Sequence, residues 1–269
     1  MKSAFATLAL LATTALAQQG ATPLIVAHRG ASHDAPENTL AAQRLAWEQG
    51  ADAVETDIHL TRDGRIIVLH DKSLKRTTGR DAPVVDVTLA EARTLDAGSW
   101  KSPRFAGEKL PTLAEQFALV PPGKRLLVEI KTGPEIVPEL ARMLAAAGAS
   151  EATVKIISFN YDSLKAVREK LPRFPTLYLV GYDTRRLEAG TQPTLADIIA
   201  QARAAGLTGL DLQKTWPLTD PDVRAIRDAG LELHVWTVDE PDVARRWIEL
   251  GAASITTNRP GWLREQLRR

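Results

Sequence analysis

The chain has 269 residues, 44% of them hydrophobic, with 34 Lys and Arg against 33 Asp and Glu and no cysteine. This composition is that of an ordinary globular protein and excludes a disordered chain, a collagen-like repeat and a disulfide-stabilised scaffold. Without cysteine there is no thiolate metal site and no cysteine nucleophile, and a net charge of +1 argues against nucleic acid as a partner.

Residues 1–17 have the composition of a secretory signal peptide. Lys2 precedes a charge-free apolar stretch, and the segment ends in the small-residue pattern ALA ahead of Gln18. A membrane anchor is the alternative, but the apolar run is shorter than the ~20 residues that a span needs. The sequence therefore predicts cleavage before Gln18, export to the periplasm or the medium, one mature domain over 18–269 and no stable membrane anchor.

After this leader, short apolar runs alternate with amphipathic helical patterns. The runs are almost continuously apolar, which is typical of strands buried on both faces of a parallel sheet. In chain order the predicted strands are 24–28, 53–57, 66–70, 126–131, 153–159, 176–181, 207–213, 231–238 and 253–257. Helix signals separate them, including a capping box that begins at Thr112.

The third run is too close to the second to be its parallel neighbour. Only eight residues separate Asp57 from Ile66, whereas a parallel connection needs about a dozen or more. Strand 66–70 is therefore expected to fold back as a hairpin and to open an inserted segment at about 58–111, called the insertion below. The remaining eight β/α units predict a TIM (β/α)8 barrel, and the lack of a GxGxxG turn disfavours an open doubly wound sheet.

Acidic residues lie where two predicted strands end. Glu55 and Asp57 share one face of their strand, and Glu129 lies at the end of the next barrel strand, so all three are expected at the barrel mouth. Three converging carboxylates repel each other, which favours one divalent cation with oxygen ligands, Ca²⁺ or Mg²⁺. Zinc is disfavoured by the all-oxygen set, although two nearby histidines keep it open. The alternative is that the acids form separate ion pairs with Arg29 and Lys131.

His28 and His70 also end strands, and each is followed by a charged residue. Imidazole titrates near neutral pH, so these two side chains are candidates for the general acid and base. Arg29 and Lys131 add positive charge, and the planar guanidinium matches phosphate oxygens. A metal, two histidines and two cations together indicate phosphoester chemistry. No Walker A motif is present, so transfer from ATP is not indicated.

The residues above lie in motifs that resemble the glycerophosphodiester phosphodiesterase family, within the PI-PLC-like phosphodiesterase superfamily. The resemblance covers nearly the whole mature chain in the family's order. Its motifs are HRGASHDAPENTLAA (28–42), ETDIHLTRDGRIIVLHD (55–71), LKRTTG (74–79), LDAGSW (95–100), LPTLAEQF (110–117), VEIK (128–131), VWTVDE (235–240) and ITTNRPG (255–261). It implies a TIM barrel with a small insertion after the second strand.

The resemblance also implies a role for each candidate residue. By position these are catalysis by His28 and His70, metal binding by Glu55, Asp57 and Glu129, phosphate contact by Arg29, and substrate contact by Lys131 and Trp236. The implied reaction is metal-dependent hydrolysis of a small-molecule glycerophosphodiester to sn-glycerol 3-phosphate and an alcohol. We expect it to run through a cyclic phosphate, with direct attack by water as the alternative and with His28 preferred as the base.

Two other functions stay open at this point, a lysophospholipase D-type phosphodiesterase and an inactive glycerophosphodiester-binding protein. The second is disfavoured because none of the implied site residues is substituted. One departure is visible: many family members have Asp where Asn258 stands, and we interpret that position as structural, helping to start the final helix. Glu37 and Asn38 are likewise expected to serve the start of the first helix. The head group, the metal and any oligomeric partner are left open by the sequence.

Overall fold

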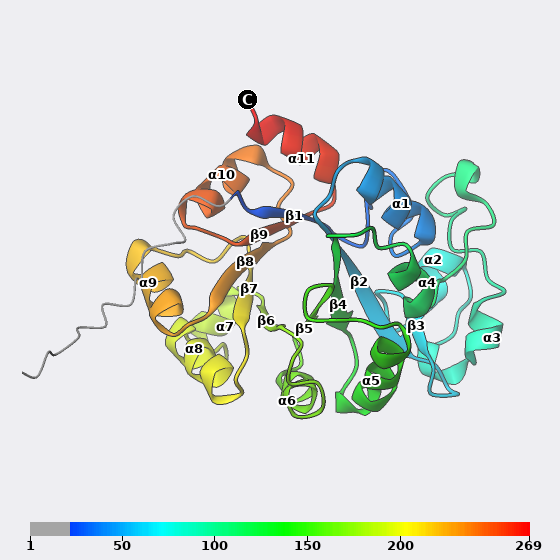
Figure 1. Ribbon diagram of the computed structural model, residues 1–269, viewed down its shortest axis with the longest axis horizontal. Helices are drawn as coiled ribbons and strands as arrows, with labels where there is room; N and C mark the ends of the chain where they lie inside the picture. Colours follow the sequence, from blue (N-terminus) through cyan, green and yellow to red (C-terminus); the bar gives the residue numbers. More distant parts are fainter. Residues whose placement is uncertain (1–21) are drawn as a thin grey trace, which may run out of the picture.

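Short apolar strands form the inner wall of the molecule (Figure 1). The computed structural model describes residues 22–269. Its strands are β1 (Leu24–Ala27), β2 (Ala53–Leu60), β3 (Ile66–Val68), β4 (Arg125–Ile130), β5 (Val154–Ser158), β6 (Thr176–Val180), β7 (Gly209–Gln213), β8 (Glu232–Trp236) and β9 (Ser254–Thr257). All nine predicted strands are present. Their side chains are mostly buried on both faces, because one face lines the barrel interior and the other lies under helices.

Eight of these strands close into a parallel barrel. The sheet runs in the order β1-β9-β8-β7-β6-β5-β4-β2, and β1 pairs with β2 to complete the ring. At the closing seam Val26 pairs with Ala53, and on the other side of β1 Ala27 pairs with Thr257. The predicted TIM barrel is therefore confirmed, and the carboxyl ends of all eight strands open at one mouth.

Helices cover the outside of the barrel (Figure 1). They are α1 (Leu40–Glu48), α2 (Lys75–Thr78), α3 (Leu89–Ala92), α4 (Leu113–Ala118), α5 (Val137–Ala146), α6 (Tyr161–Lys170), α7 (Thr184–Glu188), α8 (Leu195–Ala204), α9 (Asp220–Asp228), α10 (Pro241–Glu249) and α11 (Pro260–Leu267). The capping box predicted at Thr112 is formed, with Glu115 returning the bond to the cap. None of the helices within 22–269 is long and apolar enough to cross a membrane, and the predicted leader 1–17 lies outside the described residues.

The insertion begins with the predicted hairpin. β3 runs antiparallel to β2, with Ile58 opposite Val68 and Leu60 opposite Ile66. The segment carries α2, α3 and two short 3₁₀ helices, Val84–Asp86 and Pro103–Phe105. It has its own small apolar core, formed by Ile67, Leu69, Leu74, Val84, Val87, Ala92, Ala97 and Leu110. Because it has this core, the insertion packs as a separate unit beside the barrel mouth.

Candidate active site

The turn after β1 is shaped to bring two polar groups to the mouth. Arg29 and Gly30 have left-handed backbones, with φ values of 56° and 82°. A Cβ on Gly30 would lie 2.6 Å from a backbone carbon of Ala42, so the turn packs directly on α1 and needs glycine. This conformation lets the Arg29 amide donate to Glu55 Oε2 at 2.9 Å. The turn and β2 therefore meet at the same carboxylate.

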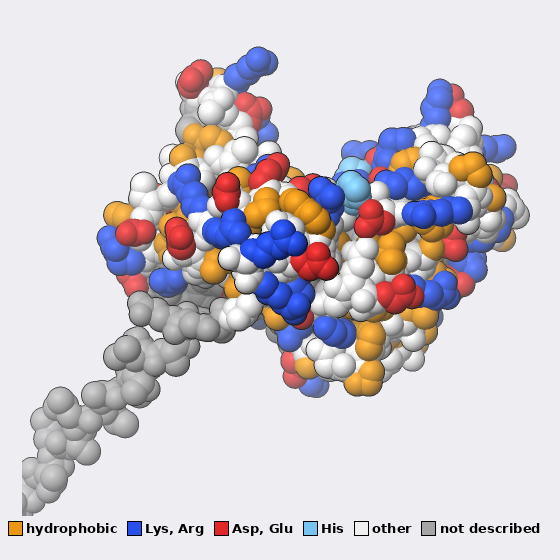
Figure 2. All heavy atoms as spheres, turned by 90° about the horizontal axis from the view of Figure 1, so that it is seen from above, with side chains coloured by type: hydrophobic (Ala, Val, Ile, Leu, Met, Phe, Trp, Pro, Cys, Tyr) orange, Lys and Arg blue, Asp and Glu red, His pale blue; other side chains and the backbone are white. Residues whose placement is uncertain are grey.

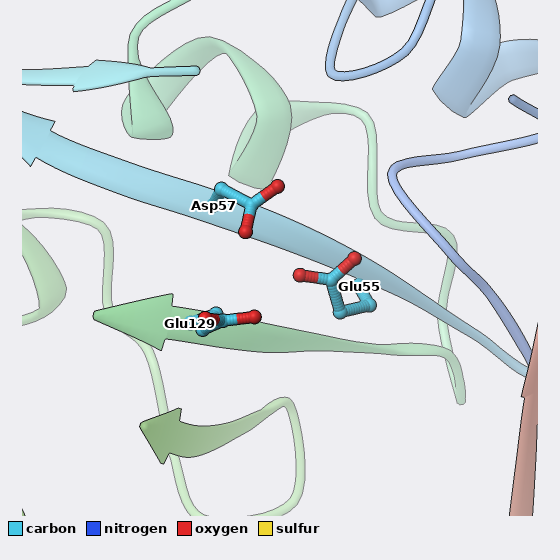
Figure 3. Close-up of side chains that lie close together, drawn as sticks. All are labelled: Glu55, Asp57 and Glu129. Atoms are coloured by element: carbon cyan, nitrogen blue, oxygen red, sulfur yellow. The ribbon is translucent and has the colours of Figure 1, made fainter. Parts of the chain in front are cut away.

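The three predicted metal ligands come together (Figure 3). Glu55 and Asp57 project from β2, and Glu129 projects from β4, where it is paired in register with Asp57. All three side chains are buried, and one oxygen of each lies within 4.8 Å of the others. The strand spacing of the sequence thus predicts the cluster correctly.

Ion pairs are also formed, but they do not cover the cluster. Arg29 Nε lies 3.4 Å from Asp57 Oδ2, while Lys131 Nζ lies 3.4 Å from Asp57 Oδ1 and 2.7 Å from Glu129 Oε1. Two cations therefore face three carboxylates. Among the described residues, Glu55 Oε1 and Asp57 Oδ1 are buried without a hydrogen-bond partner. Burying an oxygen without a hydrogen-bond partner costs free energy, and a bound cation that takes oxygen ligands would offset that cost.

The pKa values of the three acids are shifted in different directions by this arrangement of charges. Burial and the neighbouring Asp57 and Glu129 raise the pKa of Glu55 well above its ordinary value. Burial and Asp57 raise the pKa of Glu129 to about 7. Burial acts in the same direction on Asp57, but Lys131 and Arg29 outweigh it and hold the pKa of Asp57 below its ordinary value. A divalent cation would allow all three acids to be ionised, so the residues present fit such an ion.

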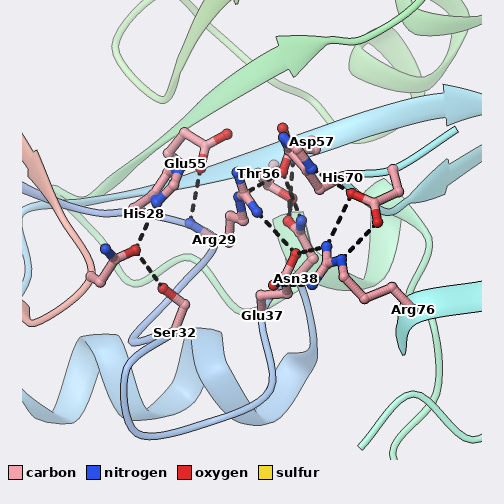
Figure 4. A network of polar contacts seen from close by, with 12 residues as sticks. His28, Arg29, Ser32, Glu37, Asn38, Glu55, Thr56, Asp57, His70 and Arg76 are labelled. Atoms are coloured by element: carbon pink, nitrogen blue, oxygen red, sulfur yellow. Dashed lines mark hydrogen bonds and ion pairs between the residues drawn. The ribbon is translucent and has the colours of Figure 1, made fainter. Parts of the chain in front are cut away.

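His70 is held from the side of the insertion (Figure 4). Its Nδ1 lies 2.7 Å from Asp71 Oδ1, and Arg76 Nε donates to Asp71 Oδ2 at 2.7 Å. The bonds from Arg76 hold the pKa of Asp71 well below its usual range. Arg76 also donates two bonds to Glu37, which in turn accepts from Arg29 at 3.0 Å. A chain of charges thus joins the insertion to the turn after β1.

His28 has a different partner. Its Nδ1 lies 2.8 Å from the amide oxygen of Asn258, which follows β9. Burial and the nearby charge of Arg29 lower the pKa of His28 to about 4, so the ring is neutral at pH 7. The interpretation of Asn258 as a helix-starting residue is wrong: Arg259 occupies the N-cap of α11, without a side-chain capping bond. The Asn258 side chain is turned toward the barrel mouth instead.

The expectation that Glu37 and Asn38 serve the start of α1 is also wrong. Thr39 is the N-cap of that helix, and its first turn carries no acidic residue. Asn38 has a left-handed backbone, with φ of 60°, and its amide donates to Asp57 Oδ2 at 2.7 Å. Both residues therefore support the carboxylate and arginine groups of the mouth. The sequence feature that could have indicated these roles is that both residues lie in the same short motif as His28.

Trp236 ends β8, across the mouth from the acids. It packs edge to face against Phe159, with ring centroids 5.3 Å apart, and Lys131 Nζ lies 5.8 Å from the Phe159 ring. Phe159 is 46% exposed, so an apolar wall borders the charged groups. His234, which shares a strand with Trp236, is buried and bonded to Ser254, and so belongs to the core.

The surface over the barrel mouth is hollowed. Figure 2 shows histidine side chains within a depression between two raised parts of the surface, with basic and acidic side chains beside it. An open depression lined by titratable and charged groups is typical of an active site for a small polar ligand.

Comparisons with known proteins agree with this geometry. A family model described as the glycerophosphoryl diester phosphodiesterase family matches residues 28–262. A glycerophosphodiester phosphodiesterase of Caldanaerobacter subterraneus is 35% identical, over 88% of this chain and 94% of its own. One from Bacillus subtilis is 33% identical, over 88% of this chain and 84% of its own.

Solved structures share the fold. A phosphodiesterase of Oleispira antarctica, in complex with the product sn-glycerol-3-phosphate, superposes with a TM-score of 0.80 at 27% identity, covering 92% of this chain and 97% of its own. A putative glycerophosphoryl diester phosphodiesterase from Silicibacter pomeroyi has a TM-score of 0.81 at 26% identity, covering 93% and 94%.

Proposed function

Because the chain belongs to the glycerophosphoryl diester phosphodiesterase family, we propose that it hydrolyses glycerophosphodiesters to sn-glycerol 3-phosphate and an alcohol. The observation that carries this proposal is the pairing of a buried three-carboxylate cluster with two histidines held in different surroundings at one barrel mouth. The similar phosphodiesterase from Oleispira antarctica was solved with sn-glycerol-3-phosphate as its product, which supports the same substrate class here.

Glu55, Asp57 and Glu129 hold one divalent cation in this proposal, either Ca²⁺ or Mg²⁺. When bound, the ion supplies positive charge that draws electrons from the phosphorus of the substrate. Arg29 and Lys131, both beside Asp57, bind the remaining charge of the phosphodiester.

Trp236 and Phe159 contact the organic part of the substrate. Their exposed edge offers an apolar surface next to Lys131, where a carbon chain can lie while the phosphate faces the cations. The same wall makes a lysophospholipid, which keeps one acyl chain, the second candidate substrate.

The two histidines divide the proton transfers. Neutral His28 takes the proton of the substrate's 2-hydroxyl, and that oxygen attacks phosphorus at the high effective concentration of an intramolecular group. The bond from phosphorus to the alcohol oxygen breaks, and His70, in its protonated form, gives that oxygen a proton. Asp71 faces the protonated His70 ring and stabilises it. A cyclic 1,2-phosphate results, and water opens it with the roles reversed.

An assay of purified protein on paired substrates tests this function. Glycerophosphocholine and glycerophosphoethanolamine should release sn-glycerol 3-phosphate, activity should disappear after dialysis against EDTA, and Ca²⁺ or Mg²⁺ should restore it. An analogue lacking the 2-hydroxyl should not be cleaved. Cleavage of that analogue at the normal rate would mean direct attack by water, and faster turnover of lysolipids would shift the substrate class.

We also propose that residues 1–17 direct export to the periplasm or the medium and are removed, which leaves a mature chain of residues 18–269. The support is the sequence of the leader, a lysine followed by a charge-free apolar stretch and a small-residue cleavage pattern.

A further inference from the structure

The amide of Asn258 lies between a carboxylate and a histidine, and the carboxylate determines which way the amide points. Asp239 Oδ2 accepts a bond from Asn258 Nδ2 at 2.7 Å, while Asp239 Oδ1 accepts from the Thr257 hydroxyl at 2.8 Å and from the Asn258 backbone at 2.9 Å. An ionised carboxylate has no proton to donate. The NH₂ end of the amide must therefore face Asp239.

Asp239 is ionised under working conditions. Burial would raise the pKa of this acid, but the bonds from Asn258 and Thr257 outweigh burial and hold the pKa below its ordinary value. The carboxylate is partly buried and accepts bonds from three donors. It has no spare proton that would let the amide turn round.

The opposite end of the amide, Oδ1, consequently faces the mouth. It accepts from the Ser32 hydroxyl at 3.0 Å and lies 2.8 Å from His28 Nδ1. A carbonyl oxygen can only accept, so Nδ1 must carry the proton. In a neutral imidazole the lone pair is then on Nε2.

We propose that Asp239 and Asn258 are positioning residues that hold His28 in its Nδ1–H form and so leave Nε2 ready to accept a proton. The catalytic consequence rests on the proposed function; the tautomer itself does not. Arg29, Asp57 and His70 carry the nearby charges that act most strongly on His28, Glu55 lies beside it (Figure 4), and none of the four supplies this bond. The neutral amide also distinguishes His28 from His70, whose Nδ1 faces a carboxylate.

The tautomer can be read directly by ¹⁵N NMR of the metal-free protein labelled at its five histidines, with His28→Ala identifying the signal. The ring should show a protonated Nδ1 and an unprotonated Nε2. In Asn258→Ala that preference should be lost and kcat should fall by about 10-fold or more, with KM little changed. A protonated Nε2 in the unaltered protein, or an unchanged tautomer and kcat in Asn258→Ala, would overturn the proposal.

A paired exchange separates positioning from simple damage. Each single variant should lower kcat. Asp239→Asn places two amides against each other, and Asn258→Asp places two carboxylates against each other. Asn258→Asp keeps an acceptor facing His28 Nδ1 and should keep the Nδ1–H form, whereas Asp239→Asn lets the amide turn round and should lose it. Combined, the two changes restore a donor facing an acceptor, so the double variant should show the Nδ1–H form and most of the activity. Its carboxylate now faces His28, which should move the acid limb of kcat/KM up by about one pH unit or more. A kcat of the double variant that is no higher than that of both single variants would refute the positioning role.

Thr194→Ala serves as a matched control. It removes the side-chain bond at the N-cap of α8, where the Thr194 hydroxyl accepts from the Asp197 amide at 3.2 Å, and it touches none of the residues bonded to His28. It should lower the melting temperature and leave both the His28 tautomer and kcat unchanged. If His28→Ala proves fully active while the NMR result holds, the proposed base is wrong and the tautomer assignment stands.

Discussion

His28 and His70 are the same side chain in two kinds of surroundings. The first is half-buried beside Arg29, where burial and that charge lower its pKa to about 4, and is bonded to a neutral amide, so it stays unprotonated at neutral pH. The second faces Asp71, an acid that Arg76 keeps ionised, so a protonated ring has a partner. A proton acceptor and a proton donor can therefore be present together at one pH, although both side chains are histidines.

Alanine substitution should separate these two roles. His28→Ala and His70→Ala should each lose activity on a natural diester by about 10² to 10⁴. A substrate with a nitrophenol leaving group needs no proton on the departing oxygen, so it should rescue only His70→Ala. The measurement is kcat on both substrates, with exposed His33→Ala as the control. Equal rescue of both variants would contradict the assignment of acid and base.

Glu129 should make the metal-free protein sensitive to pH. Its pKa is raised in the folded state from 4.5 to about 7, so the folded protein binds this proton more tightly than the unfolded chain does. The contribution of Glu129 to the free energy of unfolding should therefore fall as pH rises from about 4.5 to about 7, and level off above that. Glu129→Gln removes this loss, so in EDTA at pH 8 it should melt at least about 3 °C higher than the unaltered protein.

The comparison that checks this is thermal unfolding at pH 5 and pH 8, with EDTA and with Ca²⁺. The gain in melting temperature from Glu129→Gln should be smaller at pH 5, and Ca²⁺ should stabilise the variant less than the unaltered protein. Glu169→Gln, on the exposed face of α6, should change neither result. A variant that is less stable than the unaltered protein at pH 8 in EDTA would show that Glu129 is satisfied without a metal.

At the scale of elements, the strands and their order follow from local rules. Apolar runs locate all nine strands, and the short gap before Ile66 correctly predicts that β3 turns back. The carboxylate cluster follows too, since i, i+2 spacing and parallel register place Glu55, Asp57 and Glu129 together. These relations depend on neighbours in the chain or in adjacent strands.

The contacts that support the site could not be read in the same way. The amide of Asn258 reaches His28 across 230 positions of sequence, and Arg76 reaches Glu37 only because the insertion packs against the turn after β1. These contacts depend on how whole elements pack against each other, so they cannot be predicted from the spacing of residues in the sequence. An Asn ahead of a helix is most often a cap, which is why the local rule gave the wrong role to Asn258.

Arg76 links Asp71, the partner of His70, to Glu37 before α1. Lys101, Arg104 and Arg93 also tie the insertion to the rest of the chain, so loss of Arg76 should act on the site rather than on the fold. Arg76→Ala leaves Asp71 and Glu37 with fewer partners, and His70 should lose its orientation. We expect kcat to fall by about 10- to 100-fold, with a change in melting temperature of only about 2 °C. Arg80→Ala, exposed four residues further on, should retain full activity. A similar loss in both variants would point to general loosening of the insertion.

At the scale of the whole molecule, the closed barrel makes the described domain self-contained. β1 pairs with both β2 and β9, so the first and last strands lie side by side and no barrel edge is left unpaired within 22–269. The wall begins at Leu24, several residues after the predicted cleavage point. Removal of the leader therefore costs the barrel none of its strands.

The exported protein should accordingly begin at Gln18. N-terminal sequencing or intact mass of material recovered outside the cytoplasm measures this directly. Replacing Ala15 and Ala17 together by Leu removes the small-residue pattern and should leave the leader attached. Recovery of exported protein that still starts at Met1 would show that 1–17 is not a cleaved signal.

The two histidines belong to pieces of the chain that can change independently. His28 stands on the barrel wall, whereas His70, Asp71 and Arg76 all belong to the insertion, which has its own apolar core. A chimera that exchanges residues 58–111 for those of a relative, with Glu37 retained as the partner of Arg76, would replace His70, Asp71 and Arg76 in one step. Glu55, Asp57 and Glu129 and the turn after β1 lie outside 58–111 and would be untouched. Under the proposed division of roles, selectivity for the departing alcohol would change with residues 58–111, while the groups proposed to face phosphorus would stay the same.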